Sequence, residues 1–562
     1  MTELTRRSLF GLAATGSVGL AACTTLPGAS QAYDGEVSFD HGVASGDPLS
    51  NRVIVWTRVT PKSGSGPIPV SYEVTDAAGA IVSSGLLSAE ASHDFCVKAD
   101  AAGLSPATAY SYKFTALTRA GEVTSPTGRT RTTAASGTAP VRFGVVSCSN
   151  WQFGLFNAYA ALAAEDNLDA IIHLGDYFYE YGTDGYGGEV ALAIGRPHEP
   201  THECVTLADY RARHAQYKTD PNLQAAHAAV PWICTWDDHE SANNSYRTGA
   251  ANHNPEKGEG NWSDRKMAAV QAYFEWQPIR DMEAGRISTA VWRSFDFGDV
   301  ATVCALESRL TGRSEDISWF TALSGATGEE DLAQRAAITM GQVNDPDRTM
   351  LGVDQEAWLD SELKRSVDDG KTWQVLANQV VMAKVALPKM QDTLTPEQIA
   401  AQDNSYVQQM IGFSALGLPS NLDAWDGFPA ARERLYDSVT RAGARLVTLA
   451  GDTHTAWANT LHDAAGKRCG VEFGCTSITS PGSGSAVKDV PELGKLFSDA
   501  NKDVDWHDPF GHGYILVTLS ADSATAEFRK VSDILSPDWT LETASVWKSE
   551  PKEGGVTCLK PA

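Results

Sequence analysis

Four apolar segments of this chain end abruptly in acidic, imidazole or thiol side chains. They are RFGVVSC (142–148), AIIHLGD (170–176), WICTWDDHE (232–240) and RLVTLAGDTH (445–454). Each segment is short and rich in β-branched residues, which is typical of a buried strand. Helical patterns lie between them, as in LFNAYAALAAE at 155–165. This alternation predicts an α/β core with a site at the carboxyl ends of its strands.

The side chains at these four ends are all of types that bind metal ions. They are Cys148; Asp176 with Tyr179; Asp237, Asp238, His239 and Glu240; and Asp452 with His454. Carboxylates are rarely placed beside a core unless they are paired or metal-bound. Oxygen and imidazole ligands suit hard or borderline cations, and a thiolate adds a softer ligand. Two close cations would hold the oxygens of a phosphoryl group, and Asp176 is the natural bridge between them.

The region before this core has a different pattern. Residues 33–135 contain short β-rich runs separated by turn residues, which predicts a small all-β domain. Its segment LSPATAY (104–110) has a form common in fibronectin type III-like sandwiches, in which the tyrosine bonds back to the backbone. A linker of small residues at 134–140 separates this domain from the core. We expect the last segment, 531–562, to dock on the body through its tryptophans.

Charge and the N-terminus restrict the partners and the cellular compartment. The formal net charge of −25 for 562 residues argues against a surface that binds nucleic acid or an anionic membrane. Residues 1–32 read as an export signal, with Arg6 and Arg7 before a short apolar run, and they resemble a signal for the twin-arginine translocase. The run ends at Cys23 in a lipobox-like sequence, so we expect a periplasmic or extracytoplasmic protein, with a lipid anchor as one alternative.

Cys469 and Cys475 form a plausible disulfide pair.

These motifs together resemble the alkaline phosphatase D (PhoD-like) family of metallophosphoesterases. The resemblance rests on GDYFYE (175–180), WDDHE (236–240) and GDTH (451–454), and on two longer blocks, FDHGVASGDPLSNRVIVWTR (39–58) and TLADYRARHAQYKTDPNLQAAHAAVPWICTWDDHE (206–240). The motifs LESR (306–309) and ANQVV (377–381) fit as well. The resemblance spans about residues 37 to 530. It implies a calcineurin-like α/β/β/α sandwich over 140–530.

The resemblance also implies a role for each site residue. Iron(III) would be held by four side chains: Cys148, Asp176, Tyr179 and Asp452. Calcium would be held by Asp238 and His454, with Asp176 bridging the two metals. His239 would act as proton donor or oxyanion partner, and Arg309 would bind the substrate phosphate. Asn243 is a weaker candidate for contact with the second metal or the phosphate. Asp237 is a candidate metal ligand as well, although orientation of the loop is its expected role.

The implied reaction is direct attack of water on phosphorus, in phosphate diesters and monoesters, at a dinuclear centre. The chain has no G-x-S-x-G sequence that would present a serine nucleophile. One departure from the family pattern is Glu307, where aspartate is more usual, and it puts any role at that position in doubt.

Two other interpretations fit parts of the pattern. A surface lipoprotein could bind phosphate or a polyanion through its metals without catalysis, but His239 argues against a pure binder. A purple acid phosphatase-like enzyme would also use a tyrosine on ferric iron, but it would carry G-N-H-E in place of D-D-H-E.

Overall fold

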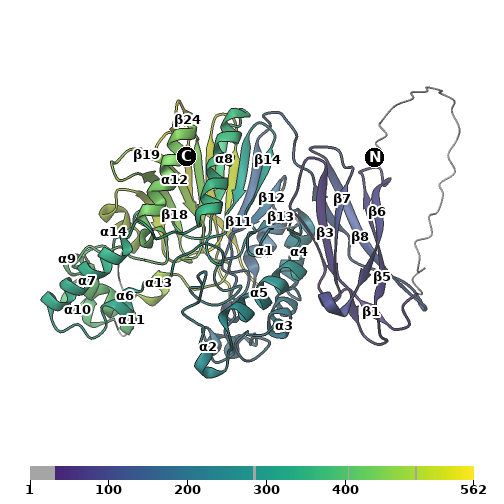
Figure 1. Ribbon diagram of the computed structural model, residues 1–562, viewed down its shortest axis with the longest axis horizontal. Coiled ribbons are helices and arrows are strands. Elements are labelled where there is room, and N and C mark those ends of the chain that lie inside the picture. The colour runs from purple at the N-terminus through teal and green to yellow at the C-terminus, as the bar shows by residue number, and fades with distance from the viewer. Residues whose placement is uncertain (1–31, 283–285, 403, 488–489, 491) are drawn as a thin grey trace, which may run out of the picture.

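The computed structural model describes residues 32–282, 286–402, 404–487, 490 and 492–562. The predicted export signal lies outside these residues except for Ala32, and so does Cys23. An N-terminal β-sandwich lies at one end of the molecule, a mixed α/β body lies in the middle, and a group of helices lies at the other end (Figure 1). Within the described ranges, no helix combines enough length and apolar character to cross a bilayer.

One sheet of the sandwich is built by five strands in the order β10-β8-β5-β6, with β9 added to β8. Their bounds are Ile68–Thr75 (β5), Ile81–Ala89 (β6), Ala109–Thr118 (β8), Gly121–Thr124 (β9) and Gly128–Arg131 (β10). Alternate residues of β8 are buried, as expected for a strand with one face on a core. The Tyr110 hydroxyl accepts a hydrogen bond from the Ser105 backbone N–H at 2.8 Å, so the tyrosine of this segment bonds back to the backbone as predicted.

The other sheet of the sandwich continues without a break into the α/β body. Its ten strands run in the order β26-β23-β22-β21-β11-β12-β13-β2-β3-β7, and the join is a parallel pairing of Trp232 in β13 with Gly46 in β2. A side chain at position 46 would lie 2.3 Å from the Pro278 carbonyl oxygen, so only glycine fits this join. The bounds are Val43–Gly46 (β2), Arg52–Arg58 (β3), Cys96–Ala102 (β7), Val141–Val146 (β11), Ala170–His173 (β12), Trp232–Cys234 (β13), His512–Leu519 (β21), Ala524–Val531 (β22), Leu541–Ser549 (β23) and Lys560–Pro561 (β26).

The C-terminal segment extends this same sheet. Strand β23 pairs antiparallel with β22, and Trp547 packs into the core between the sheets.

A second sheet of seven strands packs face to face against the part of the ten-stranded sheet that lies in the body. Its order is β14-β15-β16-β17-β19-β18-β20. The bounds are Arg293–Phe297 (β14), Ala301–Ala305 (β15), Trp373–Ala377 (β16), Leu446–Ala450 (β17), Ala456–His462 (β18), Arg468–Gly474 (β19) and Val504–Asp508 (β20). One buried cluster joins residues from both sheets, including Val145 of β11 and Val447 of β17.

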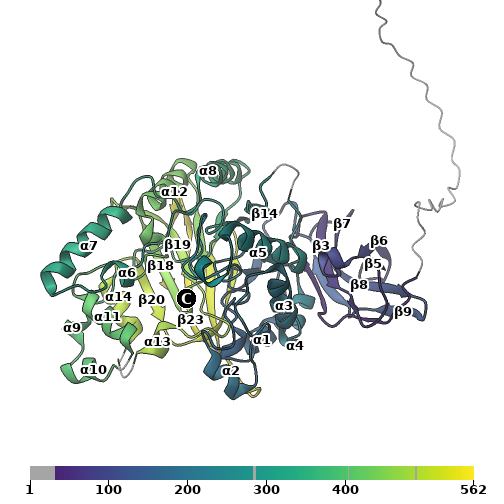
Figure 2. The ribbon, with the colours of Figure 1, turned by 60° about the horizontal axis from the view of Figure 1, so that its bottom comes forward.

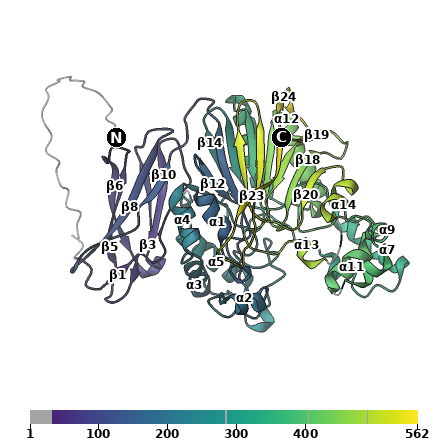
Figure 3. The ribbon, with the colours of Figure 1, turned by 180° about the vertical axis from the view of Figure 1, so that it is seen from behind.

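Helices cover the outer faces of both sheets (Figure 3). In β11, Val145 faces the second sheet while Val146 faces helices, because successive side chains of a strand point to opposite sides. The helices on the first sheet are Asn157–Ala163 (α1), Leu207–Tyr217 (α3), Pro221–Ala229 (α4) and Trp262–Trp276 (α5). Those on the second are Val353–Asp368 (α8) and Pro429–Ala442 (α12). The body is therefore helix, sheet, sheet, helix in section; its calcineurin-like and fibronectin-like kinships stay predictions.

Another group of helices forms the end of the molecule far from the sandwich (Figure 2). They are Trp319–Ala322 (α6), Glu329–Val343 (α7), Met390–Thr393 (α9), Pro396–Ala400 (α10) and Ser405–Ser414 (α11). Two more, Ser483–Ala486 (α13) and Leu493–Ala500 (α14), lie between this group and β18 and β20. A further helix, Gly188–Ile194 (α2), lies beside the loop that follows β12.

The expected disulfide between Cys469 and Cys475 is wrong. Residues 468–474 form one strand, β19, and both cysteines are free. Six residues of extended chain span about 20 Å, much more than a disulfide can bridge.

Candidate metal centre

The predicted strand ends do converge on one site. Strands β11, β12 and β13 are parallel neighbours, so the residues that follow them lie along one edge of the first sheet. Strand β17 of the facing sheet brings Asp452 and His454 to the same place. The side chains of Cys148, Asp176 and His454 offer ligand atoms that lie within 4.8 Å of one another. The site is thus built where the two sheets meet.

The backbone is unusual at this edge. Four predicted ligands have positive φ angles, which few residues other than glycine adopt: Cys148 (61°), Asp176 (55°), Asp452 (65°) and His454 (60°). Backbone strain of this kind persists where surrounding structure holds it, and it is concentrated at functional sites. Gly175 precedes Asp176 with φ of 108°, and a side chain there would lie 2.4 Å from the Asp237 backbone nitrogen. Glycine is therefore required between the two carboxylate loops.

The ligand atoms form three overlapping groups. The groups are Cys148, Asp176 and His454; Asp176, Asp238 and His239; and Asp237, Asp238 and Asp452. The Tyr179 hydroxyl belongs with the first, since it lies 3.2 Å from Asp176 Oδ2 and 3.0 Å from His454 Nε2. Asp176 is shared by the first and second groups and Asp238 by the second and third, as bridging ligands would be.

This grouping changes the expected division between the two metals. His454 lies with Cys148 and Tyr179, whereas Asp452 lies with Asp237 and Asp238. The family resemblance places Asp452 with Cys148 and Tyr179 and places His454 with Asp238, so the geometric grouping differs from these assignments, which stay predictions. Asp237, for which we expected orientation of the loop rather than ligation, offers a ligand atom within 4.8 Å of those of Asp238 and Asp452. Both residues lie in a tight turn, in which the Thr453 backbone N–H donates to the Gly451 carbonyl at 2.7 Å and both Asp452 and His454 have positive φ angles.

The donor atoms fit bound cations. Asp237 Oδ2 and Asp238 Oδ1 are buried and have no hydrogen-bond partner, a costly arrangement for a carboxylate unless a cation compensates. Burial raises the pKa of the Cys148 thiol, the Tyr179 hydroxyl and the Asp176 carboxyl well above their usual ranges. A cation would favour their ionised forms. The first group offers sulfur, nitrogen and phenol oxygen, and the third offers only carboxylate oxygen, so the two ends suit different metals.

His239 is held in place by a carboxylate that sequence reasoning missed. Its Nδ1 lies 2.7 Å from Glu180 Oε2, and its ring packs on Tyr179 with 4.1 Å between ring centroids. Burial alone would lower the pKa of His239, but Asp238, Glu180 and Asp176 together raise it well above the usual value. Glu180 belongs to the GDYFYE motif, and its place one residue after Tyr179 was the available signal.

Glu180 also fixes the loop that carries the weaker candidate Asn243. Its Oε1 accepts hydrogen bonds from the Asn243 backbone N–H at 2.8 Å and from Asn252 Nδ2 at 2.9 Å. Asn243 itself lines the cavity together with Asp238. Glu240, the last residue of WDDHE, is another organiser, because its carboxylate accepts from the backbone N–H groups of Asp176, Tyr177 and Asp237.

Arg309 lies behind the carboxylates rather than in the cavity. It is fully buried and donates hydrogen bonds to Asp237 and, at 2.8 Å, to Asp423. Its Nη2 lies 3.5 Å from Asp452 Oδ1. Because its donors are turned to three aspartates, its single positive charge offsets part of their mutual repulsion and its hydrogen bonds set their positions. We expected Arg309 to bind the substrate phosphate directly, but in this structure its side chain is turned to the aspartates instead.

The unusual residue Glu307 has a structural role. Its carboxylate accepts hydrogen bonds from the backbone N–H groups of Arg309, Leu310 and Thr311, at 2.6–2.9 Å. The Trp236 indole donates to it as well, at 2.9 Å. Glu307 therefore shapes the turn that presents Arg309.

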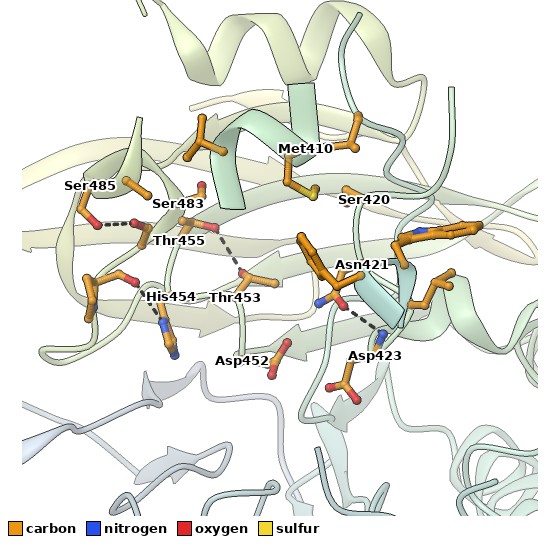
Figure 4. Close-up of a pocket in the computed structure, with 18 of the residues that line it drawn as sticks. Met410, Ser420, Asn421, Asp423, Asp452, Thr453, His454, Thr455, Ser483 and Ser485 are labelled. Carbon is orange, nitrogen blue, oxygen red and sulfur yellow. Dashed lines mark hydrogen bonds between the residues drawn. The ribbon is translucent and has the colours of Figure 1, made fainter. Parts of the chain in front are cut away.

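A cavity of about 790 Å³ opens over the ligand groups. Its lining includes Asp176, Asp238, His239, Asp452 and His454, so a substrate inside it would meet the proposed ligands directly. Figure 4 shows Asp452, His454 and Asp423 on one side of this cavity.

Comparisons with known proteins agree on one family. The family described as "PhoD-like phosphatase" matches residues 143–528, and the one described as "PhoD-like phosphatase, N-terminal domain" matches residues 24–134. The chain is 33% identical to alkaline phosphatase D of Bacillus subtilis (strain 168) over 544 residues, which cover 92% of this chain and 82% of that protein. A solved structure titled "Structure of PhoD" superposes with a TM-score of 0.73 at 30% identity, covering 95% of this chain and 93% of the other.

Proposed function

Because this chain belongs to the PhoD-like phosphatase family and is a phosphoric-ester hydrolase, we propose that it cleaves phosphate diesters and monoesters at a dinuclear iron–calcium centre. The observation that carries the proposal is the division of the ligand atoms into a mixed group around Cys148 and an all-carboxylate group around Asp452. We also propose export by the twin-arginine translocase. The family membership leaves the alternatives of a non-catalytic lipoprotein and a purple acid phosphatase-like enzyme without support.

Iron would be held by Cys148, Tyr179, His454 and Asp176, a set with the soft and phenolate donors that suit a transition metal. Calcium would be held by Asp176, Asp237, Asp238 and Asp452, which offer only oxygen. When bound, such a pair supplies positive charge that polarises the phosphoryl group and favours attack by water.

Side chains and backbone groups of the protein provide the proton transfer and hold the carboxylates in position. The Nδ1 of His239 is engaged by Glu180, so the Nε2 is the nitrogen free for the leaving-group oxygen, to which it would give a proton. The Asn244 backbone N–H donates to Asp238 Oδ2 at 2.6 Å and fixes that carboxylate. Arg309 offsets part of the repulsion among three aspartates and so helps to hold them close together.

A pair of tyrosine variants tests the metal assignment. The wild-type protein, exported by a bacterial host, should contain about one iron per chain, with calcium, and show a visible absorption band from a phenolate on iron(III). Tyr179→Phe should lose the band and most of its iron. The control is Tyr186→Phe, whose ring lies 6.2 Å from that of Tyr179 but which is 37% exposed, and it should keep both. A band that survives Tyr179→Phe would refute the phenolate ligand, and hydrolysis without iron would refute the centre.

A further inference from the structure

Residues 478–481 (Ile-Thr-Ser-Pro), which come shortly after β19, lie behind the first ligand group. The first backbone N–H of this segment donates to the Ser147 carbonyl at 3.0 Å. The Thr479 hydroxyl donates to the Asn150 carbonyl at 2.7 Å. These two bonds fasten the segment to the chain on both sides of Cys148. We call residues 478–481 the support segment.

The support segment fixes the orientation of the His454 ring. The Nδ1 of His454 lies 3.1 Å from the Pro481 carbonyl oxygen (Figure 4). A carbonyl oxygen can only accept a hydrogen bond, so the proton of the neutral ring is on Nδ1. The unprotonated Nε2 then faces the Tyr179 hydroxyl at 3.0 Å, and its lone pair is available to a cation.

Ser480 of the support segment lies against the Tyr179 hydroxyl. Its Oγ is 2.7 Å from the Tyr179 oxygen and 3.1 Å from the Cys148 carbonyl oxygen. The side chain is fully buried, and Ser480 is not one of the residues that line the cavity. A serine hydroxyl has one proton to donate. The nearer oxygen receives it when Tyr179 is ionised, because a hydrogen bond to a charged acceptor is shorter and stronger.

Metal binding would leave this hydrogen bond in place. Asp176 and His454 also lie beside the Tyr179 oxygen, but both are proposed ligands, and their lone pairs would turn to the metal. Ser480 is a neutral donor and belongs to none of the proposed ligand sets. In a buried site, a hydrogen bond to a phenolate is stronger than it would be at the surface. It draws electron density from the phenolate oxygen, so less negative charge reaches the cation.

We propose that Ser480 is a positioning residue whose hydroxyl donates a hydrogen bond to the Tyr179 phenolate, and that this bond sets how much charge the phenolate gives to the iron. This rests on the proposed function. Ser480 acts through Tyr179 rather than on the substrate, because it lies outside the cavity lining. Weaker donation by the phenolate leaves more positive charge at the centre for the substrate phosphate.

The first experiment compares visible spectra of the full-length, iron-loaded protein and two variants. Ser480→Ala should move the phenolate-to-iron(III) absorption band to longer wavelength, because a phenolate without its hydrogen bond holds its electrons less tightly. The control is Thr479→Val, which removes another fully buried hydroxyl of the support segment, one that donates to a backbone carbonyl. Its band should stay at the wild-type wavelength. An unmoved band in Ser480→Ala, or an equal shift in both variants, would overturn the inference.

A second pair of variants removes the effect of side-chain size. Ser480→Thr and Ser480→Val have the same shape and differ only in the hydroxyl. The threonine variant should keep the wild-type band, and the valine variant should show the shift to longer wavelength. Competition with a chelator should show iron affinity about tenfold lower without the hydroxyl, as loss of an outer partner of a ligand does. Equal spectra and equal affinities for this pair would contradict the role of the hydroxyl.

The wild-type spectrum separates failure of this inference from failure of the proposed function. If the folded wild-type protein has no phenolate-to-iron(III) band, the iron centre is refuted and the role of Ser480 is refuted with it. If the wild-type protein has the band and the alanine and valine variants at position 480 show it unchanged, only the role of Ser480 is refuted.

Discussion

Tyr179 and Glu180 are neighbours in the chain but serve opposite sides of the site. The Tyr179 hydroxyl lies among Asp176, His454 and Ser480, while the Glu180 carboxylate engages His239 and two asparagines. Both side chains are fully buried. One short motif therefore supplies the proposed phenolate ligand and the carboxylate that holds His239, which explains why Tyr179 and Glu180 follow Gly175-Asp176 so closely.

We predict that Glu180→Gln lowers kcat about 10- to 100-fold with little change in KM, as loss of an orienting partner does. The amide oxygen can still accept a hydrogen bond from His239, but the side chain no longer carries the negative charge that keeps the imidazole protonated. Its NH₂ group would also face other hydrogen-bond donors. Metal content should not change, because Glu180 is in none of the ligand groups. The measurement is steady-state kinetics with metal analysis, and Glu189→Gln, exposed on α2, is the matched control. Loss of metal, or a change confined to KM, would contradict the positioning role.

Among the elements, the corner between α3 and α4 buries a cation. Lys218 follows α3 and is turned inward, with its Nζ 3.1 Å from His227 Nε2 and over the ring of Trp56 at 4.6 Å. Burial lowers the pKa of Lys218 to about 7. Trp56 belongs to β3 of the sandwich, so this corner packs α3 and α4 against the N-terminal strands at an electrostatic cost.

The stability of the protein should therefore depend on pH through Lys218. Its folded pKa of about 7 lies below the unfolded value of about 10.4, so the folded state binds fewer protons between these values and becomes more stable as pH rises. Lys218→Met should remove this contribution and raise the free energy of unfolding by roughly 1–3 kcal/mol at pH 7. Denaturant unfolding at pH 7 and pH 9.5 measures it, with the exposed Lys364→Met of α8 as control. An unchanged pH dependence would contradict the prediction.

For the whole molecule, the important feature is the sheet shared by sandwich and body. Asp47, just after β2, is fully buried and accepts hydrogen bonds from the Arg280 backbone N–H and from Arg293 Nη2, both at 2.7 Å. The Trp56 indole donates to the Glu275 carbonyl at 2.8 Å. With these bonds and the pairing of β13 and β2, the sandwich and the body share one packed structure, so we expect them to unfold together.

We predict that Asp47→Ala lowers the free energy of unfolding by about 3–5 kcal/mol, because it leaves the mostly buried Arg293 guanidinium without its partner. Asp281→Ala is the matched control: it removes an ion pair with Lys98 across the same junction, but its side chain is 78% exposed. That change should cost less than about 1 kcal/mol. Calorimetry should show one transition for the wild-type protein and a lower midpoint for Asp47→Ala. Equal losses for both variants would mean that burial of the pair is unimportant.

The sequence by itself determined the α/β character of the body and the set of candidate ligands. Both are local properties: each strand is recognised by its own apolar residues, and Cys148, Asp176, Asp238 and Asp452 follow such strands within a few positions. Parallel neighbours must end at one edge of a sheet, so the convergence of three of these ends could be foreseen.

The tertiary structure alone decided which of these candidate ligands lie together. His454 lies beside Cys148 and Asp452 beside Asp237 because the facing sheet sets where the turn after β17 meets the first sheet. It also decided that Arg309 meets aspartates, that Cys469 and Cys475 stay apart, and that the sandwich shares a sheet with the body. These outcomes depend on the packing of segments that are far apart in the chain. The local residue pattern of one segment does not show which distant segments it will pack against.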